Sequence, residues 1–217
     1  MNPRTDTTDT STRSGRTASG RSLFAWRGID FVVGAMLAVG LGVAFWGFDT
    51  FLYPVLNGAT AGYPPIGGLM LGIWLLPAVA GALLIRRPGA AIYVEIIAAV
   101  VEALLGNRWG AAVLVSGFLQ GLGVSVAFGL PRWRRFDVSA AMLGGVLAAV
   151  FEIAAYEWWS YYPDFSWTQK LVYLGCGMLS GAVIAGLGGF ALVRALARAG
   201  AVNAFPVAQE ARENALR

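Results

Sequence analysis

Histidine is absent from the 217-residue sequence, which also has a single cysteine, Cys176, and a single lysine, Lys170. Without histidine there can be no His-ligated zinc site, no histidine-based acyl transfer and no H-E-x-x-H metalloprotease site. One cysteine excludes an internal disulfide and a cysteine cluster. Lys170 follows Thr168 and Gln169, so the chain has no G-x-x-x-x-G-K-[ST] phosphate loop. If ATP is used, another chain has to bind it.

Charged residues are also scarce, at 13% of the chain, whereas hydrophobic residues make up 57% and the mean hydropathy is +0.64. Soluble domains carry about 25% charged residues. The 29 glycines show no collagen period. A glycine-rich, charge-poor, apolar chain is typical of helices packed together in a lipid bilayer.

Six apolar runs are each close to the roughly 20 residues that a helix needs to span about 30 Å of hydrocarbon. We therefore predict an all-α integral membrane protein, a six-helix transmembrane bundle with spans at 29–48, 66–85, 89–106, 110–130, 138–158 and 170–193.

The basic residues predict the orientation of this bundle. Of the 16 arginines and lysines, 14 fall in the two terminal segments and the 2–3 and 4–5 connections, which leaves Arg108 and Lys170 on the other side. The positive-inside rule then places both termini in the cytoplasm of a multi-pass cell-membrane protein. No basic face is interleaved with readout residues, so we expect no nucleic-acid partner.

The composition divides the chain into three parts. Residues 1–22, rich in Ser, Thr and Arg, predict a disordered cytoplasmic tail; Asp6 and Asp9 argue against a transit peptide, and the first apolar run is too long for a cleavable signal. Residues 23–196 form the membrane domain. Residues 197–217 predict a short polar cytoplasmic tail, helical or not.

Four glutamates fall inside the predicted spans, where each costs about 2.5–3.5 kcal/mol to insert. Glu95 and Glu102 are two turns apart on one face of the third span, and Glu152 lies in the outer half of the fifth. We predict ligand contacts for Glu102 and Glu152, with Gln120 midway along the fourth span and Arg108 as a nearby charge. Glu95 is either a structural residue or the floor of a pocket, and Glu157 is expected to be solvated at the interface.

Aromatic residues gather on the same outer side, where they form either a belt at headgroup level or the faces of a binding site. Together with carboxylates, they favour an organic cation or a flat heteroaromatic ring. The candidate faces are Trp46, Trp109, Tyr156 and Trp159, and Asn107 adds a polar edge. The connection at 49–65 carries Pro64 and Pro65 and is expected to be either a lid or a solvated loop.

Several spans repeat small residues every fourth position, which lets helix backbones approach closely. In the first span these are Gly34, Ala38 and Gly42. Because other spans share the pattern, most such stripes serve the bundle itself.

The chain resembles the YkoE family of S components of energy-coupling-factor (ECF) transporters, over residues 24–195. The resemblance rests on the run from Phe31 to Phe48, the segment from Gly67 to Gly72, and the stretch from Glu95 to Asn107 with Trp109-Gly110. It implies a six-helix, non-enzymatic subunit without cofactors that binds thiamine or its hydroxymethylpyrimidine (HMP) precursor from outside. It also implies docking on a transmembrane coupling subunit that works with two cytoplasmic ATPase subunits, with Gly34, Ala38 and Gly42 as candidate contacts. The alternative is a proton-coupled secondary transporter or exporter of organic cations, although no inverted repeat is evident.

Overall fold

The computed structural model describes residues 24–215, and the predicted tail at 1–22 lies outside this range. Within it, five apolar helical stretches are long enough to cross a membrane: Gly28–Ala59, Pro64–Ile85, Gly110–Gly129, Val138–Ser160 and Trp167–Arg198. They coincide with five of the six predicted spans. The remaining span corresponds to α4 (Ala90–Leu105), a shorter helix of 16 residues.

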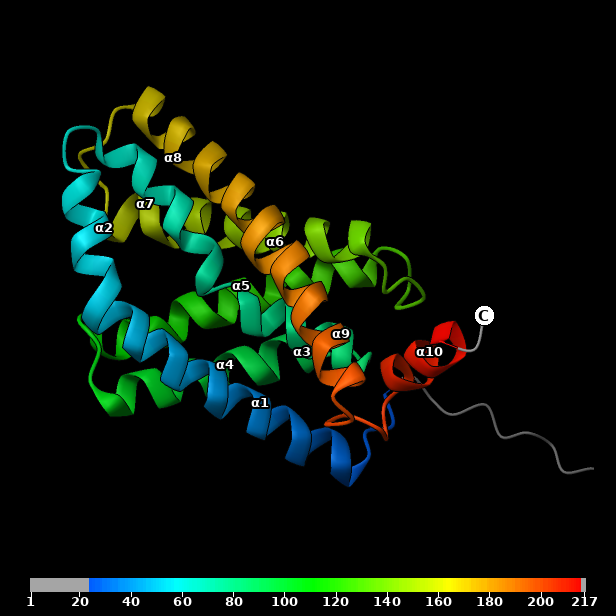
Figure 1. Ribbon diagram of the computed structural model, residues 1–217. Coiled ribbons are helices and arrows are strands. Elements are labelled where there is room, and N and C mark those ends of the chain that lie inside the picture. The colour runs from blue at the N-terminus through cyan, green and yellow to red at the C-terminus, as the bar shows by residue number, and fades with distance from the viewer. Residues whose placement is uncertain (1–23, 216–217) are drawn as a thin grey trace, which may run out of the picture.

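Most of these stretches are built from several segments (Figure 1). The first comprises α1 (Gly28–Gly47), a π turn (η1, Phe48–Leu52) and α2 (Tyr53–Ala59), and the second comprises the 3-10 helix η2 (Pro64–Ile73) and α3 (Leu76–Ile85). The 3-10 turn η3 (Gly110–Ala112) leads into α5 (Val113–Gly129). A π turn (η4, Ile153–Glu157) joins α6 (Val138–Glu152) to α7 (Trp158–Ser160). A longer π segment (η5, Gly181–Gly188) joins α8 (Trp167–Ser180) to α9 (Gly189–Arg198), and α10 (Pro206–Ala215) follows.

The expected lid or loop at 49–65 is instead largely helical. The first span continues without a break through η1 and α2 to Ala59, and η2 begins at Pro64. Proline is tolerated in the first turn of a helix because the N–H it lacks has no intrahelical acceptor there. Pro64 occupies such a position at the start of η2, whereas Pro54 follows the π turn η1 inside the continuous first span.

Glycines bring the helices into backbone contact. A Cβ atom on Gly145 of α6 would overlap the carbonyl oxygen of Gly181 in η5, which no side chain could tolerate. Large apolar side chains face outward, among them Met36, Leu104 and Leu171. Small residues inside and large apolar residues outside are the pattern expected of a lipid-embedded bundle.

The stripe of Gly34, Ala38 and Gly42 faces into the bundle. Ala38 is fully buried, and a Cβ on Gly42 would lie 2.6 Å from the carbonyl oxygen of Ala98 in α4. The structure therefore packs this stripe against α4, and its contact with a coupling subunit stays a prediction.

The predicted C-terminal tail contains the helix α10, which packs on the bundle. Phe205 is fully buried, and both Val207 and Ala208 are buried behind it. In Figure 1, α10 lies beside the start of α1 and the end of α9, while α2 and α7 lie at the opposite end of the bundle.

Candidate binding site

A cavity of about 460 Å³ opens at the end of the bundle formed by α2, α7 and the start of α8. It is lined by side chains from every span, including α4. Five of the nine residues predicted as ligand contacts line it. Glu95, Glu102 and Glu152 contribute carboxylates, Gln120 an amide and Trp109 an aromatic ring. No lysine or arginine is among the lining residues.

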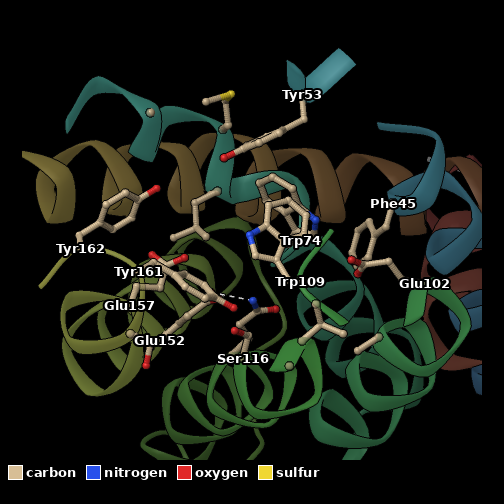
Figure 2. Close-up of a pocket in the computed structure, with 18 of the residues that line it drawn as sticks. Phe45, Tyr53, Trp74, Glu102, Trp109, Ser116, Glu152, Glu157, Tyr161 and Tyr162 are labelled. Atoms are coloured by element: carbon tan, nitrogen blue, oxygen red, sulfur yellow. Dashed lines mark hydrogen bonds between the residues drawn. The ribbon is translucent and has the colours of Figure 1, made fainter. Parts of the chain in front are cut away.

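Carboxylates lie on two sides of the cavity. Figure 2 shows Glu102 beside Phe45 on one side, and Glu152 and Glu157 near Tyr161 on the other. Asn107 lies outside the lining, but its Nδ2 donates to Glu102 Oε1 at 3.0 Å. Its Oδ1 accepts the backbone N–H of Trp109 at 3.0 Å. Asn107 therefore couples the position of Glu102 to the turn that carries Trp109.

Glu152 is held by an amide on the facing helix. Gln120 Nε2 of α5 donates to Glu152 Oε2 across 2.6 Å, drawn as a dashed line in Figure 2. Both side chains are buried. Because the amide donates through its nitrogen, its oxygen remains available as an acceptor.

Glu95 is both a structural residue and part of the cavity wall, so the two alternatives for it coexist. Its Oε2 accepts the backbone N–H of Ala78 at 2.7 Å. Ala78 lies in the first turn of α3, where backbone N–H groups have no intrahelical acceptor. A carboxylate from α4 thus stabilises the start of α3, and it still lines the cavity.

Two acceptor atoms in the cavity lining have no hydrogen-bond partner among the described residues. They are Gln120 Oε1 and Glu157 Oε2, and both are buried. An unsatisfied buried polar group costs roughly 1–3 kcal/mol, so such groups are uncommon in proteins. Two of them facing one cavity point to a ligand that donates hydrogen bonds there.

The prediction that Glu157 is solvated at the interface is wrong, because its side chain is 6% exposed and lines the cavity. The cause is the π turn η4, which adds a residue to the turn after Glu152. Regular helical spacing would place residues 156 and 159 on the face of Glu152. The π turn places Glu157 and Tyr161 there instead.

Three predicted aromatic faces lie outside the lining. Trp46 packs edge-on against Phe51, with ring centroids 6.0 Å apart. Tyr156 packs edge-on behind Tyr161 at 5.4 Å. The ring of Trp159 is 58% exposed, and Lys170 Nζ lies 4.9 Å from its centroid.

The aromatic wall instead comprises Tyr53, Trp74 and Trp109, which pack edge to face with centroid separations of 5.2–5.6 Å. The Arg108 guanidinium lies 5.1 Å from the Tyr53 centroid, so it stabilises the rings and forms no ion pair with Glu102 or Glu152 in the described structure. The sequence does not predict Tyr53 and Trp74 as ligand contacts, because Tyr53 falls in the connection at 49–65 and Trp74 is one of many apolar residues in its span.

Tyr161 and Tyr162 close the side of the cavity near Glu157 (Figure 2). Burial, with the nearby Glu157 carboxylate, raises the pKa of Tyr162 to about 12. Burial also raises the pKa of Tyr161 above its ordinary value. Both phenols are therefore neutral at physiological pH and can donate a hydrogen bond.

Comparison with known proteins gives consistent matches. Residues 29–151 match the family described as ABC-type cobalt transport system, permease component. A Bacillus subtilis (strain 168) protein named as the HMP/thiamine permease protein YkoE is 35% identical over 188 residues, spanning 86% of this chain and 92% of that protein. A crystal structure of an S component of an ECF transporter superposes with a TM-score of 0.82 at 34% identity, covering 89% of this chain and 96% of that one. Within the described residues, no group of three or more His, Cys, Asp or Glu side chains is placed to hold a metal ion.

Proposed function

The chain belongs to the YkoE family and is a substrate-binding S component of an ECF-type importer in the cell membrane, and from this premise we propose that its cavity binds HMP or thiamine. The observation that carries the proposal is the pair of buried, unpartnered acceptors, Gln120 Oε1 and Glu157 Oε2, in a cavity walled by aromatic rings. The related YkoE protein is named for the same two compounds.

The chemistry of these ligands matches the cavity at both of its acidic sides. An aminopyrimidine is a flat ring whose amino group donates hydrogen bonds, which suits the acceptors of Gln120 and Glu157 and a stacking face such as Trp109. Thiamine adds a permanently cationic thiazolium, which needs a carboxylate or an aromatic face. Glu102 supplies the carboxylate, and the wall formed by Tyr53, Trp74 and Trp109 next to it supplies the aromatic faces. The side of Glu152 and Glu157 then receives the pyrimidine.

We also propose that the bundle crosses the membrane six times, with α4 as the sixth crossing and both termini in the cytoplasm. One end of the described structure gathers Arg27, the α3–α4 turn, the α5–α6 turn and α9–α10. The cavity lies at the other end, near Arg108 and Lys170. By the positive-inside rule the cavity opens outward.

Energy for uptake has to come from other subunits, since the chain has no phosphate loop. We propose a transmembrane coupling subunit and two cytoplasmic ATPase subunits as its partners. Membership of the S-component family, in which substrate capture and ATP hydrolysis reside on different chains, argues against the proton-coupled transporter.

Calorimetry on the full chain in mild detergent tests the ligand assignment. We expect HMP and thiamine to bind, and thiamine monophosphate to bind at least tenfold more weakly, because no basic side chain lines the cavity to offset a phosphate. Glu157→Gln should weaken binding, whereas Glu213→Gln on α10 is the matched control. A protein that binds neither HMP nor thiamine, and from which mass spectrometry recovers neither, would refute the proposal.

A further inference from the structure

A second cavity, of about 360 Å³, lies at the end of the bundle opposite the binding cavity. Its walls come from the end of α3, the α5–α6 turn, α9 and α10. In Figure 1 this is the end where α10 packs beside α9. Nothing in the capture of substrate at the other end requires a cavity here.

Four arginines line this cavity: Arg86, Arg134, Arg135 and Arg194. Two of them lie against aromatic rings, which hold a guanidinium in place. The guanidinium of Arg86 lies 4.8 Å from the Phe136 centroid, and that of Arg194 lies 4.8 Å from the Phe190 centroid. Leu83 and Val193 complete an apolar floor beneath the charges.

A carboxylate of the chain itself occupies part of this site. Arg86 binds both carboxylate oxygens of Glu210 from α10, with Nη2 to Oε2 at 2.8 Å. These hydrogen bonds, helped by the charge of Arg194, hold the pKa of Glu210 below its ordinary value. A bidentate arginine contact of this kind suits a carboxylate or a phosphate equally well.

The remaining charges are not balanced within the described structure. Arg134 and Arg135 form no ion pair with any described carboxylate. Asp137, the other acid in the lining, accepts the backbone N–H of Ala140 at 2.9 Å and so caps α6. Arg134, Arg135 and Arg194 are exposed to solvent, and they line one cavity together with the apolar side chains of Leu83 and Val193.

We propose that this cavity binds a phosphoryl anion, supplied by an anionic lipid headgroup or by free phosphate, in competition with Glu210. Basic pockets between helices at the cytoplasmic surface suit phosphate headgroups. The anion sits between Arg134, Arg135 and Arg194 and takes over Arg86 when the Glu210 carboxylate leaves. Binding therefore loosens the attachment of α10.

Thermal unfolding of the full chain in mild detergent, followed by tryptophan fluorescence, tests this proposal. The probes are dioctanoyl phosphatidylglycerol, inorganic phosphate and, as a neutral control, dioctanoyl phosphatidylcholine. Each surface arginine contributes about a fivefold effect on anion binding. The double variant Arg134→Gln/Arg135→Gln should raise the half-saturating concentration of the stabilising anionic probe roughly 30-fold. Glu210→Gln should lower that concentration several-fold.

The matched control is Arg132→Gln/Arg198→Gln, which removes the same charge from the same end of the bundle at residues that do not line the cavity. Its half-saturating concentration should stay within twofold of that of the unmodified chain. Stabilisation by phosphatidylglycerol alone identifies a headgroup site, and equal stabilisation by inorganic phosphate identifies a site for the free anion. The proposal is overturned if neither anion stabilises the unmodified chain or Glu210→Gln. It is also overturned if the control double variant loses as much affinity for the anion as the cavity double variant does.

Discussion

The carboxylates of the binding cavity differ in what their neighbours leave available. Glu95 stabilises the start of α3 through Ala78, and Glu102 is held by Asn107. Glu152 is engaged by the Gln120 amide, whereas Glu157 keeps one oxygen without a partner. These contacts make Glu95 mainly a structural residue and leave Glu102, Glu152 and Glu157 as the candidates for ligand contact.

Replacing Glu102 by glutamine tests the charge at the thiazolium side, because the change preserves shape. Losing a buried charge-assisted contact costs about 2–5 kcal/mol, which corresponds to a roughly 30- to several-thousand-fold loss of affinity. Calorimetry should therefore show a larger loss for thiamine than for uncharged HMP. Glu152→Gln should weaken both ligands, because it also disturbs the Gln120 amide that faces the pyrimidine.

The melting temperature of each variant serves as the control for folding, alongside the surface change Glu213→Gln. Equal losses for both ligands in Glu102→Gln would show that this residue does not read the cation. Unchanged affinity in both cavity variants would contradict the placement of the site.

Aromatic substitutions separate the cavity wall from the surrounding belt. Trp109→Ala should weaken both ligands by about 1–3 kcal/mol, by analogy with the stacking of bases on aromatic rings. Trp159→Ala should leave affinity unchanged, because its exposed ring lies against Lys170 and away from the cavity. Calorimetry on the pair is decisive, since a loss in Trp159→Ala alone would place the ligand on the outer surface of α7.

At the scale of elements, π turns decide which side chains reach the cavity. The turn η4 moves the cavity-facing register from residues 156 and 159 to Glu157 and Tyr161. The turn η1 lets the first span continue into α2, which brings Tyr53 and Asn57 to the cavity. π turns are rare and recur at functional sites, because they redirect side chains without ending a helix.

The packing of α1 on α4 gives a matched pair of glycine substitutions. Gly42→Ala should lower the melting temperature, because its Cβ would lie 2.6 Å from the Ala98 carbonyl oxygen and 2.8 Å from the Val101 Cβ. Overpacking of this kind typically costs 1–3 kcal/mol. Gly40→Ala, two residues away with nothing within 4 Å of its Cβ, should cause no loss. Thermal unfolding in detergent measures both, and equal melting temperatures would mean that α1 and α4 are not packed this closely.

For the whole molecule, the distribution of arginines predicts which end faces the cytoplasm. In a Cys176→Ser background, a cysteine placed at Ala59, at the end of α2, should react with an impermeant thiol reagent in whole cells. A cysteine placed at Ala201, between α9 and α10, should react only after the cells are opened. The reverse labelling would overturn both the orientation and the outward opening of the cavity.

Transport should require the whole complex. The isolated chain should not hydrolyse ATP, and cells should accumulate labelled thiamine or HMP only when it is co-expressed with a coupling subunit and an ATPase. Uptake into vesicles that contain this chain alone, driven by a proton gradient, would contradict the S-component mechanism.

The sequence alone determines the features that depend on local composition. Hydropathy predicts six apolar segments, and each is helical in the structure, five of them within stretches long enough to cross a membrane. The positions of the arginines distinguish one end of the bundle from the other. Local composition also identifies isolated carboxylates in apolar runs, because a charged residue that is costly to insert into a membrane is easily recognised among apolar neighbours. Glu102, Glu152, Gln120 and Trp109, which the sequence predicts as ligand contacts, all line one cavity, and their contact with a ligand stays a prediction.

Only the tertiary structure decided which face of each helix points inward. The hydrogen bond between Gln120 and Glu152 joins residues 32 positions apart, and the one from Ala78 to Glu95 crosses between two helices. The π turn η4 shifts a helical face by one residue, and α4 buries a glycine stripe that looked equally suited to a partner. Composition is a property of a segment, whereas register and burial depend on what a helix packs against, so the wall formed by Tyr53, Trp74 and Trp109 is visible only in the folded bundle.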